Sequence, residues 1–186
     1  GGALTNQGIH HIDLLRYFGG EIEKVNCTMK TYNLDIEVEN AVISTFIFKN
    51  GAMGSLEITT AAYPDDYEAS ITIVGSKGLA KIGGLAVNEL QIFSPNNNIC
   101  KDMSEDFSNC PYGFGHELLY DDIKYTLTNK KSKTINYEDC LKTLNLLNSF
   151  YYSDEIKNWV TLNTIINSSK LGRPDETISN LYRSLK

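Results

Sequence analysis

The Asn50-Gly51 pair constrains the fold more than any other feature of this chain. Asn-Gly tolerates the positive φ angles of a tight hairpin turn, and residues 41–49, just before it, are rich in β-branched and aromatic side chains. Residues 52–60 are therefore predicted to run back antiparallel to 41–49. One such hairpin needs further strands or helices to bury its apolar face.

Alternating apolar and polar segments on both sides supply those strands. The predicted strands cover 22–32, 41–49, 52–60, 68–74, 79–82 and 85–93. Mostly short turns join them, including Gly75–Gly78, and strands joined in this way form an antiparallel meander. After the long polar loop 94–115, helical spacing appears at 116–129 and 137–152, and 133–136 can add an edge strand. The prediction is an α+β fold with one large, open, mainly antiparallel sheet and helices on one face.

A further helix is predicted in the first twenty residues, ending at Gly19-Gly20. At about 100° per residue, its polar side chains fall on one narrow stripe. The stripe contains Asn6, His10, Asp13 and Tyr17. The rest of the circumference is largely apolar, so the helix is predicted to be buried and to line a site, with Thr5 or Asn6 capping its start.

Asn6 and His10 are four residues apart and can present an amide and an imidazole to the same ligand. Histidine can take the proton from a hydroxyl that is being oxidised, or return it on reduction. Asp13 could orient the ring or cap a neighbouring group. The alternative is a histidine that only satisfies a hydrogen bond, and His11, on the apolar side, is predicted to be structural.

A second polar and aromatic cluster spans Gly113–Glu117, between Tyr112 and Tyr120. Its glycines permit close approach of a ligand, and His116 stands at a predicted helix start, where anions are favoured. The alternative is a loop that leads into a helix cap.

Composition excludes several classes of function. The 186 residues carry a formal net charge of -6, and the only short basic cluster is Lys130–Lys133, so no nucleic-acid surface is expected. No apolar run is long enough for a membrane span and no signal peptide is evident, which predicts a cytoplasmic protein. The four cysteines form no C-x-x-C pair, so free thiols are expected and no metal site. No Gly-x-Gly-x-x-Gly occurs, so no dinucleotide fingerprint is present.

The opening residues resemble a known family. Gly1–Leu4, followed by Asn6–Leu15, is similar to the start of the C-terminal domain in the glucose-fructose oxidoreductase and inositol dehydrogenase (Gfo/Idh/MocA) family. The resemblance continues through Val38–Ala41, Phe48–Gly54 and Ile73–Gly78. It implies an NAD(P)-dependent sugar or cyclitol dehydrogenase whose Rossmann domain is absent from this chain. Residues 1–186 would then be a single substrate-binding and oligomerisation domain, a fragment of a longer two-domain enzyme.

The resemblance also implies residue roles. His10 aligns with the family's acid/base histidine, whereas Asn6 stands where the family usually has Asp, so it could bind substrate but not act as a base. Tyr112, His116 and Tyr120 would approach the substrate, and Asp13 would support the site. NAD or NADP would be bound mainly by the absent domain, which would also supply a catalytic lysine.

The narrower resemblance is to the branch that oxidises UDP-N-acetyl-glucosaminuronic acid at C3 in surface-polysaccharide synthesis. The isolated fragment is predicted to be inactive and to form a homo-oligomer through the open sheet face. Two alternatives remain: an inositol or free-sugar dehydrogenase of the same family, and a non-catalytic assembly domain.

Overall fold

The computed structural model describes residues 1–32, 35–84, 86–110, 113–129 and 136–171. The chain divides into two compact units, one formed by residues 1–61 with 137–186 and the other by residues 62–136. Each unit has its own sheet. The prediction of a single domain stays a prediction.

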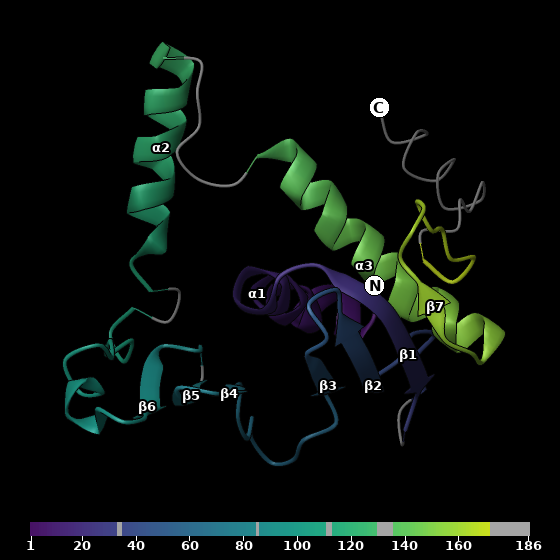
Figure 1. The fold of residues 1–186 in the computed structure, drawn as a ribbon, viewed down its shortest axis with the longest axis horizontal. Helices are drawn as coiled ribbons and strands as arrows, with labels where there is room; N and C mark the ends of the chain where they lie inside the picture. Colours follow the sequence, from purple (N-terminus) through teal and green to yellow (C-terminus); the bar gives the residue numbers. More distant parts are fainter. Residues whose placement is uncertain (33–34, 85, 111–112, 130–135, 172–186) are drawn as a thin grey trace. The chain divides into compact units, whose positions relative to one another are not determined.

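The first unit is built on a four-stranded antiparallel sheet in the order β3-β2-β1-β7. Its strands are β1 (Ile22–Lys30), β2 (Ala41–Phe48), β3 (Met53–Thr59) and β7 (Val160–Thr161). Two helices, α1 (Ile9–Gly19) and α3 (Tyr137–Ile156), lie over one face of this sheet (Figure 1). The predicted hairpin is confirmed: β2 pairs with β3, and Gly51 at the turn has a φ of 88°.

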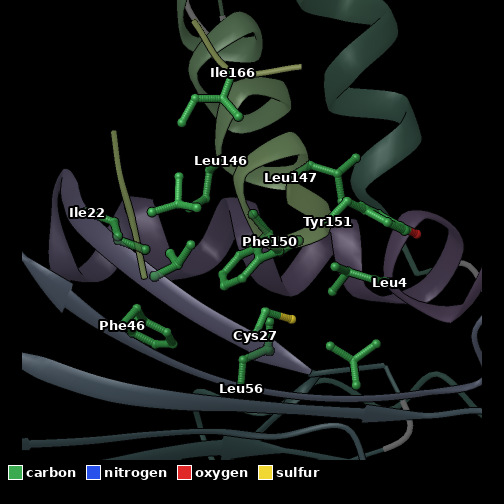
Figure 2. Packing of buried hydrophobic residues seen from close by; sticks show 14 of the residues in the cluster. Leu4, Ile22, Cys27, Phe46, Leu56, Leu146, Leu147, Phe150, Tyr151 and Ile166 are labelled. Carbon is green, nitrogen blue, oxygen red and sulfur yellow. The ribbon is translucent and has the colours of Figure 1, made fainter. Parts of the chain in front are cut away.

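The alternation along β2 explains why the helices cover only one face. Val42, Ser44, Phe46 and Phe48 are buried beneath the helices, whereas Ile43 on the opposite face is 65% exposed. Side chains of successive strand residues point to opposite faces, so one set builds the core and the other faces solvent. Figure 2 shows the core, where Phe46 and Cys27 from the sheet meet Leu146 and Phe150 from α3.

The second unit holds a three-stranded antiparallel sheet in the order β4-β5-β6. Its elements are β4 (Ile71–Gly75), β5 (Gly78–Gly83), β6 (Glu89–Phe93), the short 3₁₀ turn η2 (Asn97–Ile99) and helix α2 (Gly115–Asn129). The α+β class with antiparallel strands is therefore confirmed. The described strands are divided between two sheets instead of forming the one large sheet that was predicted. Most of the predicted edge strand 133–136 lies outside the described residues.

The opening helix differs from the prediction at its start. A π-helical turn, η1 (Leu4–Gly8), precedes α1 directly, and neither Thr5 nor Asn6 caps it. The predicted cap is wrong because the helix begins before these residues and takes its cap from a distant side chain. The predicted stop is confirmed: Gly20 has a φ of 87°, and its N–H donates to the Arg16 carbonyl at 2.9 Å.

None of the helices in the described ranges has the length and apolar character to cross a membrane.

Candidate functional site

The helix that begins the chain is buried on one side only. Leu4, Gly8, Ile12 and Arg16 recur every four residues along η1 and α1, and all four are buried. Tyr17 is 80% exposed. The helix was predicted to be buried except along its polar stripe, to which Tyr17 belongs. Phe18 lies outside that stripe and is 43% exposed, so the burial is less complete than predicted.

Asn6 and His10 both lie on the exposed side, on η1 and on the first turn of α1. The Asn6 N–H donates to the Gly2 carbonyl at 2.9 Å, a bond within the first helical turn. The two side chains are open to an incoming ligand. This placement allows an amide and an imidazole to act on the same molecule.

Asp13, one turn beyond His10, is tied to α3. The Thr143 hydroxyl donates to its Oδ1 at 2.6 Å, and the Arg16 guanidinium stands 3.8 Å from the same oxygen. The carboxylate thus links α1 to the helix packed beside it. A supporting role for Asp13 stays a prediction, and these contacts suit such a role.

Arg16 is the buried centre of a polar cluster that sequence reasoning missed. Its guanidinium donates to Thr143 Oγ1 at 2.6 Å, to Asp139 Oδ1 at 2.9 Å and to Glu21 Oε1 at 3.2 Å. Burial lowers the pKa of Arg16, but the hydrogen bonds to Asp139 and Glu21 outweigh it and hold the pKa above its ordinary value. Because α1, the following turn and α3 each contribute a group, the cluster fixes the angle at which α1 sits.

A second missed cluster lies at the start of the helix. Glu39 Oε1 accepts hydrogen bonds from the Leu4 N–H at 3.0 Å and from the Tyr151 hydroxyl at 2.6 Å. Tyr151 also bonds to the Thr5 hydroxyl at 2.8 Å. Glu39 stands in one of the segments that carry the family resemblance, but the sequence gives no sign of its partners.

The remaining predicted residues are placed as follows. His11 is half-buried and its Nδ1 has no hydrogen-bond partner; burial lowers its pKa. His116 and Tyr120 are exposed on α2, in the second unit, so a joint site with His10 stays a prediction. Tyr112 lies outside the described residues. All four cysteines are free, which confirms the thiol prediction.

A surface hollow of about 240 Å³ lies between α1, β1 and α3, lined by Arg16, Glu21, Lys142 and several apolar side chains. Asn6 and His10 are not among its lining residues, so it is distinct from the exposed stripe. In the described part of the chain, no group of three or more His, Cys, Asp or Glu side chains could hold a metal ion.

The described residues do not form the fold that commonly binds a dinucleotide. The Rossmann fold, which binds dinucleotides, is built from parallel strands with a glycine-rich turn that leads into a helix. The strand pairs of the described residues are all antiparallel. No role in dinucleotide binding is therefore assigned to the described residues.

Comparisons with known proteins agree with this architecture. Residues 1–81 match the family model of the GFO/IDH/MocA C-terminal domain. The WlbA dehydrogenase from Bordetella pertussis, solved with NADH and UDP-GlcNAcA, is 32% identical with a TM-score of 0.78, over 88% of this chain and 49% of that one. The WlbA dehydrogenase from Chromobacterium violaceum, with the same ligands, is 37% identical with a TM-score of 0.76, over 87% and 46%.

More distant structures share the fold alone. Levoglucosan dehydrogenase in complex with NADH is 21% identical, with a TM-score of 0.69, over 88% of this chain and 50% of that one. No curated protein sequence matches the chain. The chain spans about half the length of the solved structures that it matches.

The described residues form an α+β domain with antiparallel sheets, whose opening helix carries Asn6 and His10 on its exposed side. The chain is similar to the C-terminal domain of the GFO/IDH/MocA family, whose model matches residues 1–81.

Proposed function

We propose that this chain is the substrate-binding and oligomerisation domain of an NAD-dependent sugar-nucleotide dehydrogenase, which oxidises a UDP-N-acetyl-hexosaminuronate at C3 in polysaccharide biosynthesis. The observation that carries the proposal is the identity of 32% and 37%, over nearly the whole chain, to two dehydrogenases solved with NADH and UDP-GlcNAcA. The exposed Asn6 and His10 supply the polar groups that such a substrate requires.

His10 would act as the acid/base group. Its unprotonated ring nitrogen takes the proton of the C3 hydroxyl while the carbonyl forms at C3, and it returns the proton in the reverse direction. Asn6 donates or accepts a hydrogen bond at a substrate oxygen and cannot remove a proton. NAD, when bound by the remainder of the enzyme, supplies the acceptor for the hydride that leaves C3.

His116 and Tyr120 would contact the sugar nucleotide from α2. Both side chains are exposed, and they are one helical turn apart, so they can reach the same ligand. Oligomerisation would use the open face of the β3-β2-β1 sheet, where Ile43 and Met53 stand in solvent. Exposed apolar side chains on a sheet face often mark a contact with another chain.

The test compares two neighbouring histidines in the complete enzyme. His10→Gln should lower kcat for the UDP-sugar by roughly 10²–10⁴-fold, as expected for loss of an acid/base group. His11→Gln, the matched control, should retain kcat within about threefold because His11 lies to the side of the stripe. Formation of NADH is measured with UDP-N-acetyl-glucosaminuronate, with inositol and with free sugars.

Three results would contradict the proposal in different ways. Turnover of inositol or a free sugar alone would favour the other dehydrogenase activity. Equal kcat for His10→Gln and wild type would favour a non-catalytic assembly domain. Reduction of NAD by residues 1–186 alone would show that this domain holds a complete active site.

A further inference from the structure

The helical turn that carries Asn6 takes its cap from a residue 35 positions further along the chain. The Leu4 N–H donates to Glu39 Oε1 at 3.0 Å, and the Ala3 N–H donates to the Glu39 backbone carbonyl at 2.9 Å. No side chain of the turn itself caps it. The first N–H groups of a helix lack partners within the helix and favour a nearby negative charge, so Glu39 meets both needs.

Tyr151 locks this cap to α3. A carboxylate oxygen can only accept, so the Tyr151 hydroxyl donates to Glu39 Oε1 at 2.6 Å, and the Thr5 hydroxyl in turn donates to the Tyr151 oxygen at 2.8 Å. Burial and the neighbouring Glu39 carboxylate raise the pKa of Tyr151, which keeps the proton in this bond. Figure 2 shows the Tyr151 side chain extending from α3 toward the turn that contains Leu4.

The carboxylate fits closely against the backbone at residue 2. A Cβ placed on Gly2 would lie 2.0 Å from Glu39 Oε2, far inside any permitted contact. Because Gly2 has no side chain, the Glu39 carboxylate can occupy this space. Close packing against the Gly2 backbone and the hydrogen bonds to Ala3 and Leu4 together hold the turn against Glu39.

The turn held in this way is π-helical, from Leu4 to Gly8, and α1 begins one residue before His10. The angle between the Asn6 and His10 side chains differs between a π turn and an α turn, because the two have different numbers of residues per turn. A π turn is uncommon and is frequently found at functional sites. The π-helical form of the Leu4–Gly8 turn therefore sets the direction in which the Asn6 and His10 side chains point relative to each other.

We propose that Glu39 and Tyr151 are positioning residues that hold this π turn and so set the direction in which Asn6 and His10 meet the substrate. The proposal rests on the proposed function for the identity of the reaction. The attachment itself depends only on contacts within residues 1–61 and 137–171. Neither residue touches the substrate in this scheme, and both act through Thr5 and Leu4.

The activity test uses four variants of the complete enzyme. Glu39→Ala and Tyr151→Phe should each lower kcat roughly 10- to 100-fold, the size expected when a reacting group is displaced by about 1 Å. Glu39→Gln keeps an acceptor oxygen for Leu4 and Tyr151, so it should restore kcat to within about threefold of wild type. Ser153→Ala removes a buried hydroxyl of α3 that bonds to Cys27 and Asn158, and controls for lost stability alone.

A second measurement follows the turn without catalysis. In the 186-residue chain, Glu39→Ala should speed amide hydrogen exchange at Leu4–Gly8 by tenfold or more, whereas Ser153→Ala should leave exchange there unchanged. If exchange at Leu4–Gly8 is unchanged in Glu39→Ala and Tyr151→Phe, the inference is overturned whatever the activity.

The two measurements separate the inference from the proposed function. Faster exchange with kcat equal to that of Ser153→Ala would overturn the positioning role. An inactive wild-type enzyme, or a fully active His10→Gln variant, would overturn the proposed function, while the exchange result would still support or refute the anchoring of the turn by Glu39 and Tyr151.

Discussion

Replacement of Arg16 by Met should destabilise the first unit by roughly 2 kcal/mol. The Arg16 side chain is 6% exposed and donates to Asp139, Glu21 and Thr143, so the variant loses hydrogen bonds to two carboxylates. Such charge-assisted bonds contribute about 1.5–3 kcal/mol each when both groups are buried. Met occupies a volume similar to the Arg stem, so little packing is lost.

Two features of the site reduce the loss of stability expected from these hydrogen bonds. The Glu21 and Asp139 side chains are 44% and 45% exposed, so water can hydrate both carboxylates once the guanidinium is gone. The Arg16 Nε is a buried donor without a partner, which costs about 1–3 kcal/mol and disappears in the variant. The expected loss is therefore smaller than the roughly 3–5 kcal/mol for one partner of a fully buried pair.

Trp159 makes this loss measurable in one unit. It is the chain's single tryptophan and lies in the same unit as Arg16, with the Lys24 ammonium 5.5 Å from its ring centroid. Urea unfolding followed by tryptophan fluorescence thus reports this unit. Lys142→Met is the matched control, because Lys142 is 56% exposed and bonds to the same Glu21 oxygen at 3.3 Å; its loss should stay within about 1 kcal/mol.

The loss of unfolding free energy in Arg16→Met should also depend on pH. Burial raises the pKa of Glu21, but hydrogen bonds from Arg16 and Lys142 outweigh it and leave the pKa below its ordinary value. A lowered folded-state pKa means that the stabilisation is complete above that value and is lost as the pH falls through the folded-state pKa. The Arg16→Met penalty should be full at neutral pH and smaller at about pH 3.

A loss no larger than that of Lys142→Met would refute this reasoning, because Arg16 would then behave as an ordinary surface ion pair. A penalty that stayed constant between neutral pH and about pH 3 would show that carboxylate ionisation plays no part in it.

Two other predictions concern the sheet and the thiols. Ile43→Lys, on the open sheet face, should convert the proposed oligomer to a monomer in analytical ultracentrifugation, whereas Ile43→Val should not; an intact oligomer in Ile43→Lys would exclude this face. A thiol reagent should label the exposed Cys140 in the folded protein and Cys27 only after unfolding, since burial raises the pKa of Cys27 to about 12; equal labelling rates by mass spectrometry would contradict this.

Strands β1, β2 and β3 of the first unit could be predicted because their information is local, whereas β7 was not predicted. Asn50-Gly51 specifies the turn, and alternation along β2 specifies which side chains reach the core. Both follow from residues within a few positions of one another. The division into two sheets could not be predicted in this way, since it depends on how segments beyond residue 60 pair.

The helix start shows the opposite case. Thr5 and Asn6 are good capping residues by type, yet Glu39 takes the position because the fold brings it to the Leu4 amide. The prediction from the sequence also overestimated the burial of α1. Periodicity shows which side chains of a helix are apolar, but it does not show how many elements pack against that helix. The spacing of Asn6 and His10 predicts that they share one side of the helix, and both are exposed; their joint role stays a prediction.

The opening helix is attached to the rest of its unit at three points. Glu39 and Tyr151 hold its start, Thr143 holds Asp13 at its middle, and the Arg16 cluster holds its end. A site that positions a ligand needs side chains fixed by packing and hydrogen bonds beneath them. Because α1 is held at three points along its length, its exposed side can carry polar groups that contribute little to stability. The fold therefore depends on the buried side of the helix, which leaves Asn6 and His10 available for the substrate contacts proposed above.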